Sequence, residues 1–230
     1  MNKFEMSNVE RLMLRRKIKR KKRIRTLIII MLSVILVLCG VFIFVKSRGT
    51  SSGGSLGVFE KKLNAKTLEC PDYVDVQLID TGLARTGVKL IEINNIVIHY
   101  VGNPGTTAQN NRDYFNKSDT EVCSHFLIGL NGEIIQCVPL DEKSNASNNR
   151  NLDTISVEVC HPDSSGRFNE ATYNSLVKLT AWLCDNSGLK AKDVIRHYDI
   201  TGKECPKYFV DNESEWENFL DEVKQELKNY

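Results

Sequence analysis

Residues 96–101 read Ile-Val-Ile-His-Tyr-Val, and residues 155–159 read Ile-Ser-Val-Glu-Val. Both runs are short and dominated by aliphatic, mostly β-branched residues, which is typical of buried strands. Each run nevertheless contains an ionisable side chain, His99 in the first and Glu158 in the second. Since a buried carboxylate is costly unless it is paired or functional, the two runs predict central strands that carry the residues of a site.

The sequence around these runs alternates between strand and helix patterns. We expect strands at about 95–101, 123–128, 133–138, 154–160 and 193–197. Leu130-Asn-Gly132 is typical of a hairpin turn between the second and third of them. Apolar residues recur at helical spacing in other segments, so we expect helices at about 106–117, 169–186 and 213–228. The predicted fold class is α/β, with a central mixed β-sheet flanked by helices.

Two further candidate site residues lie in the stretch RHYDITGKECP at 196–206. His197 and Cys205, together with His99, offer two imidazoles and a thiolate, the ligand types that Zn²⁺ prefers. Three protein ligands leave a fourth position for water, as in catalytic zinc sites, and Glu158 is then free to act as a general base. Taken singly, a histidine in an apolar strand is more often a core residue, and a buried cysteine is more often a small hydrophobe. Together these residues predict a zinc-dependent hydrolase.

Four motifs carry a resemblance to a known family. They are IVIHYVGNPG at 96–105, SHFLIGLNG at 124–132, ISVEV at 155–159 and HYDITGKECP at 197–206. In this order they resemble the N-acetylmuramoyl-L-alanine amidases, the family of phage amidase-type lysozymes, bacterial autolysins and animal peptidoglycan recognition proteins. The resemblance runs from about Val74 to Phe209, which is well over half of the chain.

The resemblance implies a role for each chemical residue. The zinc ligands of the family map onto His99, His197 and Cys205. The glutamate maps onto Glu158, and the lysine two residues before the last ligand maps onto Lys203, which would stabilise the oxyanion. Zn²⁺ is therefore the expected cofactor.

One position departs from the family pattern. Ser124 stands where many relatives carry a catalytic tyrosine before the His-Phe pair, so we assign the general-base role to Glu158. The neighbouring His125 is either a substrate contact beside the site or a structural histidine. Asn103, in the first motif, is a further candidate substrate contact, and His161 is expected to be solvated.

The expected function is that of a peptidoglycan hydrolase. It would cut the amide bond between N-acetylmuramic acid and L-alanine with a zinc-activated water. The alternative is a non-catalytic peptidoglycan-binding module, as in several animal relatives. Non-catalytic members replace the last ligand, so the presence of Cys205 favours the enzyme. Muramyl peptides are the expected partner, and the oligomeric state stays open.

The N-terminal part has a different character from the rest of the chain. Residues 1–25 hold 11 of the 31 Lys and Arg, whereas residues 49–230 are acidic. The uncharged run 26–45 spans ~30 Å as a helix, about the thickness of a bilayer core, and is longer than the apolar region of a cleavable signal peptide. It therefore predicts a single transmembrane helix that follows a basic cytoplasmic segment at 1–25.

The domain organisation follows from that anchor. A Gly- and Ser-rich flexible linker is expected at 46–70, followed by an amidase domain at 71–230. The protein is expected in the cell membrane, with the lipid bilayer as a partner, the catalytic domain outside and no nucleic-acid partner. Of the seven cysteines, Cys123 and Cys137 flank the predicted hairpin, but the sequence alone assigns no disulfide pairing.

Overall fold

The computed structural model describes residues 63–230, and residues 1–62 lie outside this part. The basic segment at 1–25, the helix at 26–45 and most of the linker at 46–70 that the sequence predicts therefore lie outside the described residues. Residues 63–70, at the end of that predicted linker, pack against the folded part. The Asn64 side chain donates hydrogen bonds to the carbonyls of Ile93 (2.8 Å) and Ser187 (3.0 Å).

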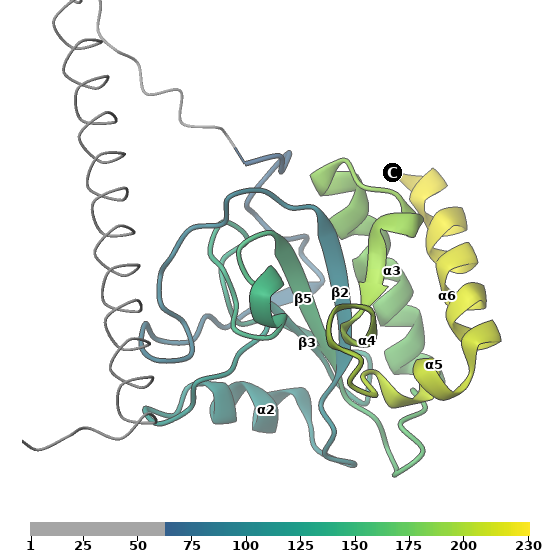
Figure 1. The fold of residues 1–230 in the computed structure, drawn as a ribbon, viewed down its shortest axis with the longest axis horizontal. Helices are drawn as coiled ribbons and strands as arrows, with labels where there is room; N and C mark the ends of the chain where they lie inside the picture. The colour runs from purple at the N-terminus through teal and green to yellow at the C-terminus, as the bar shows by residue number, and fades with distance from the viewer. Residues whose placement is uncertain (1–62) are drawn as a thin grey trace, which may run out of the picture. The chain divides into compact units, whose positions relative to one another are not determined.

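A six-stranded sheet forms the centre of the described part (Figure 1). Its strands are β1 (Val74–Val76), β2 (Asn95–Tyr100), β3 (Phe126–Ile128), β4 (Ile134–Gln136), β5 (Thr154–Val159) and β6 (Val194–Arg196). They lie in the order β1-β4-β3-β5-β2-β6, and only the β3–β4 pair is antiparallel. The predicted mixed sheet is confirmed, including the turn between β3 and β4, where Gly132 has a φ of 82°.

Helices cover both faces of this sheet (Figure 1). The α-helices are α2 (Ala108–Phe115), α3 (Glu170–Ser187), α4 (His197–Thr201), α5 (Lys207–Asp211) and α6 (Glu213–Glu226). Short 3₁₀ helices occur at η1 (Asn148–Arg150), η2 (Ala191–Asp193) and η3 (Leu227–Asn229). The predicted helices correspond to α2, α3 and α6. The sequence patterns missed β1, α4 and α5, because three to five residues are too few to show a period.

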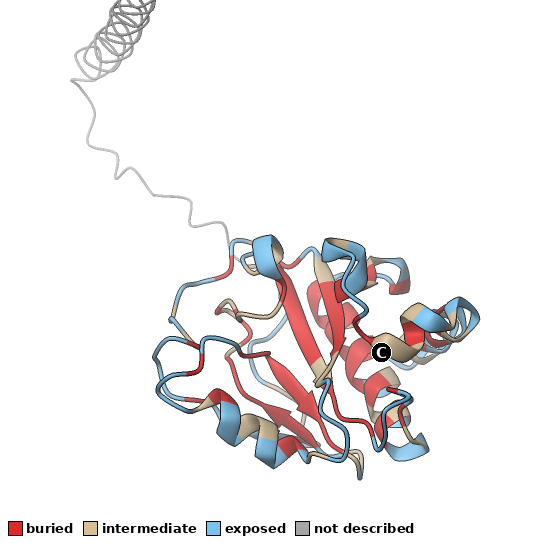
Figure 2. Cartoon of the chain, turned by 60° about the horizontal axis from the view of Figure 1, so that its bottom comes forward, coloured by how far each residue is buried: buried red, intermediate tan, exposed pale blue. Residues whose placement is uncertain are grey.

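Two hydrophobic clusters lie on opposite faces of the sheet, and Figure 2 shows the buried strands between them. The larger cluster joins alternate residues of β2 and β5, such as Ile98 and Val157, to α3 and α6. The smaller cluster joins Leu127 and Ile135 to α2. Because successive strand residues point to opposite faces, the aliphatic positions of β5 face α3, and Glu158 points to the other side.

The predicted single-pass membrane localisation is corrected by the structure. No helix in residues 63–230 is both long and apolar enough to cross a bilayer. The longest helix of that part, α3, has 18 residues and includes Glu170, Lys178 and Asp185. Its apolar side is already buried against the sheet and α6.

Candidate metal and catalytic site

The first two site residues lie side by side on the two central strands. In the parallel register of β2 and β5, His99 is the direct partner of Glu158. Both residues lie near the carboxyl ends of their strands, where ligand sites form in open α/β sheets. Their positions follow from the local sequence, since the apolar residues on either side of each one fix the strand and its register.

His197 and Cys205 come from one short segment that follows β6. His197 is the first residue of α4, which ends at Thr201 and is capped by Gly202 with a φ of 76°. The chain then turns back, and the Tyr198 amide donates to the carbonyl of Cys205 over 2.9 Å. This hydrogen bond closes the segment and brings the last predicted ligand beside the end of β2.

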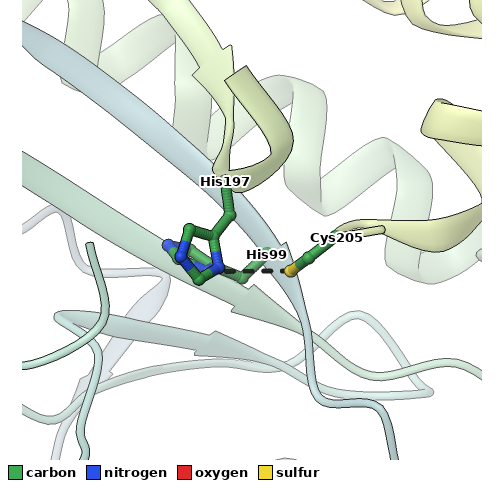
Figure 3. Close-up of side chains that lie close together, drawn as sticks. All are labelled: His99, His197 and Cys205. Atoms are coloured by element: carbon green, nitrogen blue, oxygen red, sulfur yellow. Dashed lines mark hydrogen bonds between the residues drawn. The ribbon is translucent and has the colours of Figure 1, made fainter. Parts of the chain in front are cut away.

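The three predicted ligands converge, as Figure 3 shows. One potential ligand atom from each of His99, His197 and Cys205 lies within 4.8 Å of the others, and all three residues are buried. The Cys205 Sγ lies 3.8 Å from His99 Nδ1, and the two imidazole rings have centroids 4.6 Å apart. Two imidazoles and a thiol around one point are a donor set that fits Zn²⁺.

The environment of the site favours the neutral form of both imidazoles. Burial lowers the pKa of His99 well below its usual value, and burial together with Lys203 lowers the pKa of His197. Burial and the nearby Glu158 raise the pKa of the Cys205 thiol to about 12, against the opposing effects of the Tyr100 backbone and Lys203. A bound metal cation would instead lower the pKa of the Cys205 thiol, because a coordinating thiol is deprotonated.

Glu158 lies beside the three ligands without a strong partner of its own. Its Oε1 is 3.9 Å from His99 Nδ1, and burial raises the pKa of the carboxyl to about 8, while Lys203 acts in the opposite direction. Within the described residues, Glu158 Oε2 and His99 Nε2 are buried and have no hydrogen-bond partner. A largely buried carboxyl with an unpartnered oxygen is suited to proton transfer.

A cavity of about 710 Å³ opens over this group. Its lining includes the three predicted ligands and Glu158. Lys203, whose side chain is exposed, also lines it. Tyr100, Glu121, Asn145, Asn148 and Asn151 also line it. Sequence reasoning did not single out the asparagines, although the run SNASNNRN at 144–151 is conspicuously rich in them.

The other predicted contacts lie elsewhere. His125 does not line the cavity: it is fully buried, and its Nδ1 accepts from the Ser156 amide (3.0 Å), while its Nε2 lies 2.8 Å from the carbonyl of Glu142. It is therefore the structural histidine of the two alternatives. Asn103 is exposed and also does not line the cavity. His161, expected to be solvated, is instead buried and packs on the Tyr100 ring.

Comparison with known proteins identifies the family. A family model described as N-acetylmuramoyl-L-alanine amidase matches residues 89–208, and the chain belongs to this family. The chain is 31% identical over 162 residues to the N-acetylmuramoyl-L-alanine amidase CwlL of Bacillus licheniformis, which covers 63% of this chain and 44% of CwlL. It is also 31% identical over 164 residues to BlyA of Bacillus subtilis (strain 168), which covers 62% of this chain and 44% of BlyA. The chain thus spans less than half the length of these relatives.

Solved structures share the fold. A mutant endolysin from Bacillus subtilis superposes with a TM-score of 0.58 at 24% identity, over 65% of this chain and 97% of the endolysin. The Staphylococcus aureus hydrolase AmiA, solved in complex with its ligand, superposes with a TM-score of 0.53 at 17% identity, over 70% of this chain and 85% of AmiA.

Proposed function

We propose that this chain is a zinc-dependent N-acetylmuramoyl-L-alanine amidase that hydrolyses peptidoglycan. The observation that carries the proposal is the convergence of His99, His197 and Cys205 beside the largely buried carboxyl of Glu158, in a cavity of about 710 Å³, in a chain of this family. We assign residues 71–230 as the catalytic domain, with residues 63–70 packed onto it.

The metal assignment rests on the chemistry of the donor set. His99, His197 and Cys205 would hold Zn²⁺, and their two imidazoles and one thiolate leave it with a net positive charge. When bound, zinc supplies Lewis acidity that lowers the pKa of a water molecule and polarises a carbonyl.

Glu158 is the proposed general base and acid. Its free Oε2 can take the proton that the attacking water loses, and the same carboxyl can return it to the departing amine of L-alanine, which leaves poorly as an anion. Proton uptake requires the ionised carboxylate, and the positive charges of Lys203 and of a bound metal cation would favour that form against the effect of burial.

Lys203 is the proposed electrostatic partner of the carbonyl oxygen. Lys203 lines the cavity. Its positive charge acts to lower the pKa of each of the four site residues, His99, His197, Glu158 and Cys205. A fixed cation at this position stabilises the negative charge that develops on the carbonyl oxygen during attack.

The substrate assignment follows from the relatives and from the lining. The curated relatives are named as amidases of N-acetylmuramoyl-L-alanine, and the cavity presents the amides of Asn145, Asn148 and Asn151 beside the Tyr100 ring. Amide and aromatic groups together suit a substrate that combines a sugar with a peptide. The presence of all three ligand side chains favours catalysis over the competing function, a peptidoglycan-binding module without catalysis.

Mass spectrometry of purified peptidoglycan digested with the full chain tests the proposal. We expect peptides with a free N-terminal L-alanine and glycan strands whose muramic acid has lost its peptide. The matched control is the Cys205→Ala variant, which should yield neither product. New reducing sugar ends would indicate a glycosidase, and retention on peptidoglycan without any product would indicate a binding module; either result would refute the proposed activity.

A further inference from the structure

Asn148 contacts one of the proposed metal ligands directly. Its Oδ1 lies 2.8 Å from His197 Nε2, and both residues line the same cavity. An amide oxygen can only accept, so the His197 Nε2 carries the hydrogen in this pair. The Nδ1 of His197 is therefore the nitrogen that is left without a proton in the neutral ring and is free to act as a ligand.

The backbone of Asn148 is held in an unusual conformation. Its φ is 54°, and it is the only residue other than glycine with a positive φ in the described range 63–230. Asparagine tolerates this left-handed region better than most residues, yet the conformation is still unfavourable relative to the ordinary ones. Such outliers persist where the surrounding structure imposes them, and they are concentrated at functional sites.

The loop around Asn148 is fixed to the strand that carries His99. The Arg150 guanidinium, two residues on, donates to Asn95 Oδ1 at the start of β2 (2.6 Å) and to Asp153 (2.9 Å). The Asn151 side chain accepts from the Ser147 amide over 2.7 Å. The Arg150–Asn95 bond therefore ties the loop to β2, and the Ser147–Asn151 bond closes the loop around Asn148.

We propose that Asn148 is a positioning residue for the metal ligand His197. Its Oδ1 accepts the Nε2 hydrogen, selects the tautomer whose Nδ1 is free, and sets the ring orientation before the metal arrives. The inference rests on the proposed zinc site and deepens it. The partner on the far nitrogen of a ligating histidine commonly fixes both its tautomer and its direction.

The two imidazoles of the site differ in whether the Nε2 atom has a hydrogen-bond partner. His99 is buried within a central strand, and its Nε2 has no partner in the described residues. His197 begins the short helix α4, whose C-cap, Gly202, is followed by exposed residues. The ring on the less constrained element is the one that has a dedicated acceptor, which is the expected arrangement if orientation is what Asn148 supplies.

Metal titration of the full chain with two variants tests the inference. Asn148→Gly removes the acceptor but suits the positive φ, so the metal-free protein should keep its unfolding midpoint in urea. Its affinity for Zn²⁺, measured by competition with a chelator, should fall ~10- to 100-fold. Asn148→Asp keeps an acceptor oxygen and also tolerates this backbone, so its affinity should stay within about threefold of the wild type or increase.

Cobalt substitution adds a readout of geometry. With Co²⁺ in place of Zn²⁺, the visible spectrum reports the ligand field, and we expect the Asn148→Gly spectrum to differ from those of the wild type and Asn148→Asp. Zinc affinity of Asn148→Gly within twofold of the wild type would overturn the inference, as would an equally large loss in Asn148→Asp. A lowered unfolding midpoint of metal-free Asn148→Gly would assign Asn148 a structural role instead. A wild type that binds no zinc would refute the zinc site itself.

Discussion

Replacing Glu158 by glutamine should separate catalysis from stability, and the two should change in opposite directions. The amide preserves the shape of the side chain but cannot take up a proton from water, so hydrolysis of peptidoglycan should fall by ~10²–10⁴-fold, the usual contribution of a general acid–base. Zinc content should stay near that of the wild type, because Glu158 is not among the three ligands. The same change should make the metal-free protein more stable at neutral pH.

The size of that stabilisation follows from the burial of the carboxyl. Burial raises the pKa of Glu158 from an ordinary 4.5 to about 8. The folded state then binds the proton more tightly than the unfolded state, so the wild type loses stability as the pH rises from 4.5 through 8. At ~1.36 kcal/mol per pH unit, the loss at pH 7 is about 3 kcal/mol. This is an upper limit, because 19% of the side-chain surface remains exposed to solvent.

Urea unfolding of the EDTA-treated wild type and Glu158→Gln, from pH 4.5 to 8, measures this difference. The two proteins should have similar free energies of unfolding near pH 4.5. The free energy of unfolding of the variant should then exceed that of the wild type by an amount that grows up to pH 8. A difference that does not change with pH would refute the argument from burial. A variant that loses zinc would make Glu158 a ligand, and one that hydrolyses peptidoglycan at a near-normal rate would place the proton transfer elsewhere.

Three further predictions concern other residues. Cys205→Ala should reduce zinc well below one equivalent per chain by elemental analysis while the far-ultraviolet circular dichroism is retained; undiminished zinc would exclude Cys205 as a ligand. Lys203→Ala should keep its zinc but lower turnover ~10²–10³-fold, and unchanged kcat for muramyl peptides would remove Lys203 from the mechanism. Burial lowers the pKa of His125 to about 4, so its contribution to stability is present above pH 6.5 and is lost as the pH falls through 4, by up to about 3 kcal/mol. Urea midpoints measured against His125→Gln should show this loss in the wild type alone.

The centre of the fold could be predicted because its signals are local. The runs that form β2 and β5 are apolar and long enough to reveal a strand, and His99 in the first and Glu158 in the second stand out. The short elements α4 and α5 gave no such signal, since five residues span little more than one helical turn. The residues His197 and Cys205 could therefore be related to β2 only through their ligand chemistry and the family resemblance, not through periodicity.

The residues that were misplaced or missed depend on contacts distant in sequence. His125 has partners 17 and 31 residues away, and those contacts turn a plausible substrate contact into a structural residue. Asn148 meets His197 across 49 residues. Its sequence neighbourhood, rich in asparagine, indicates a turn but cannot show which side chain that turn presents to the site.

The strand order has a consequence for the way the protein is made. The strand β2, which carries His99, is flanked by β5 and β6, both of which come much later in the chain. Cys205 follows His99 by 106 residues. A nascent chain that has just completed β5 contains His99 and Glu158 but neither His197 nor Cys205, so it cannot assemble the proposed zinc site. Under the proposed function, hydrolytic activity should therefore appear only after the ribosome has passed residue 205, and chains that end before Cys205 should not hydrolyse peptidoglycan.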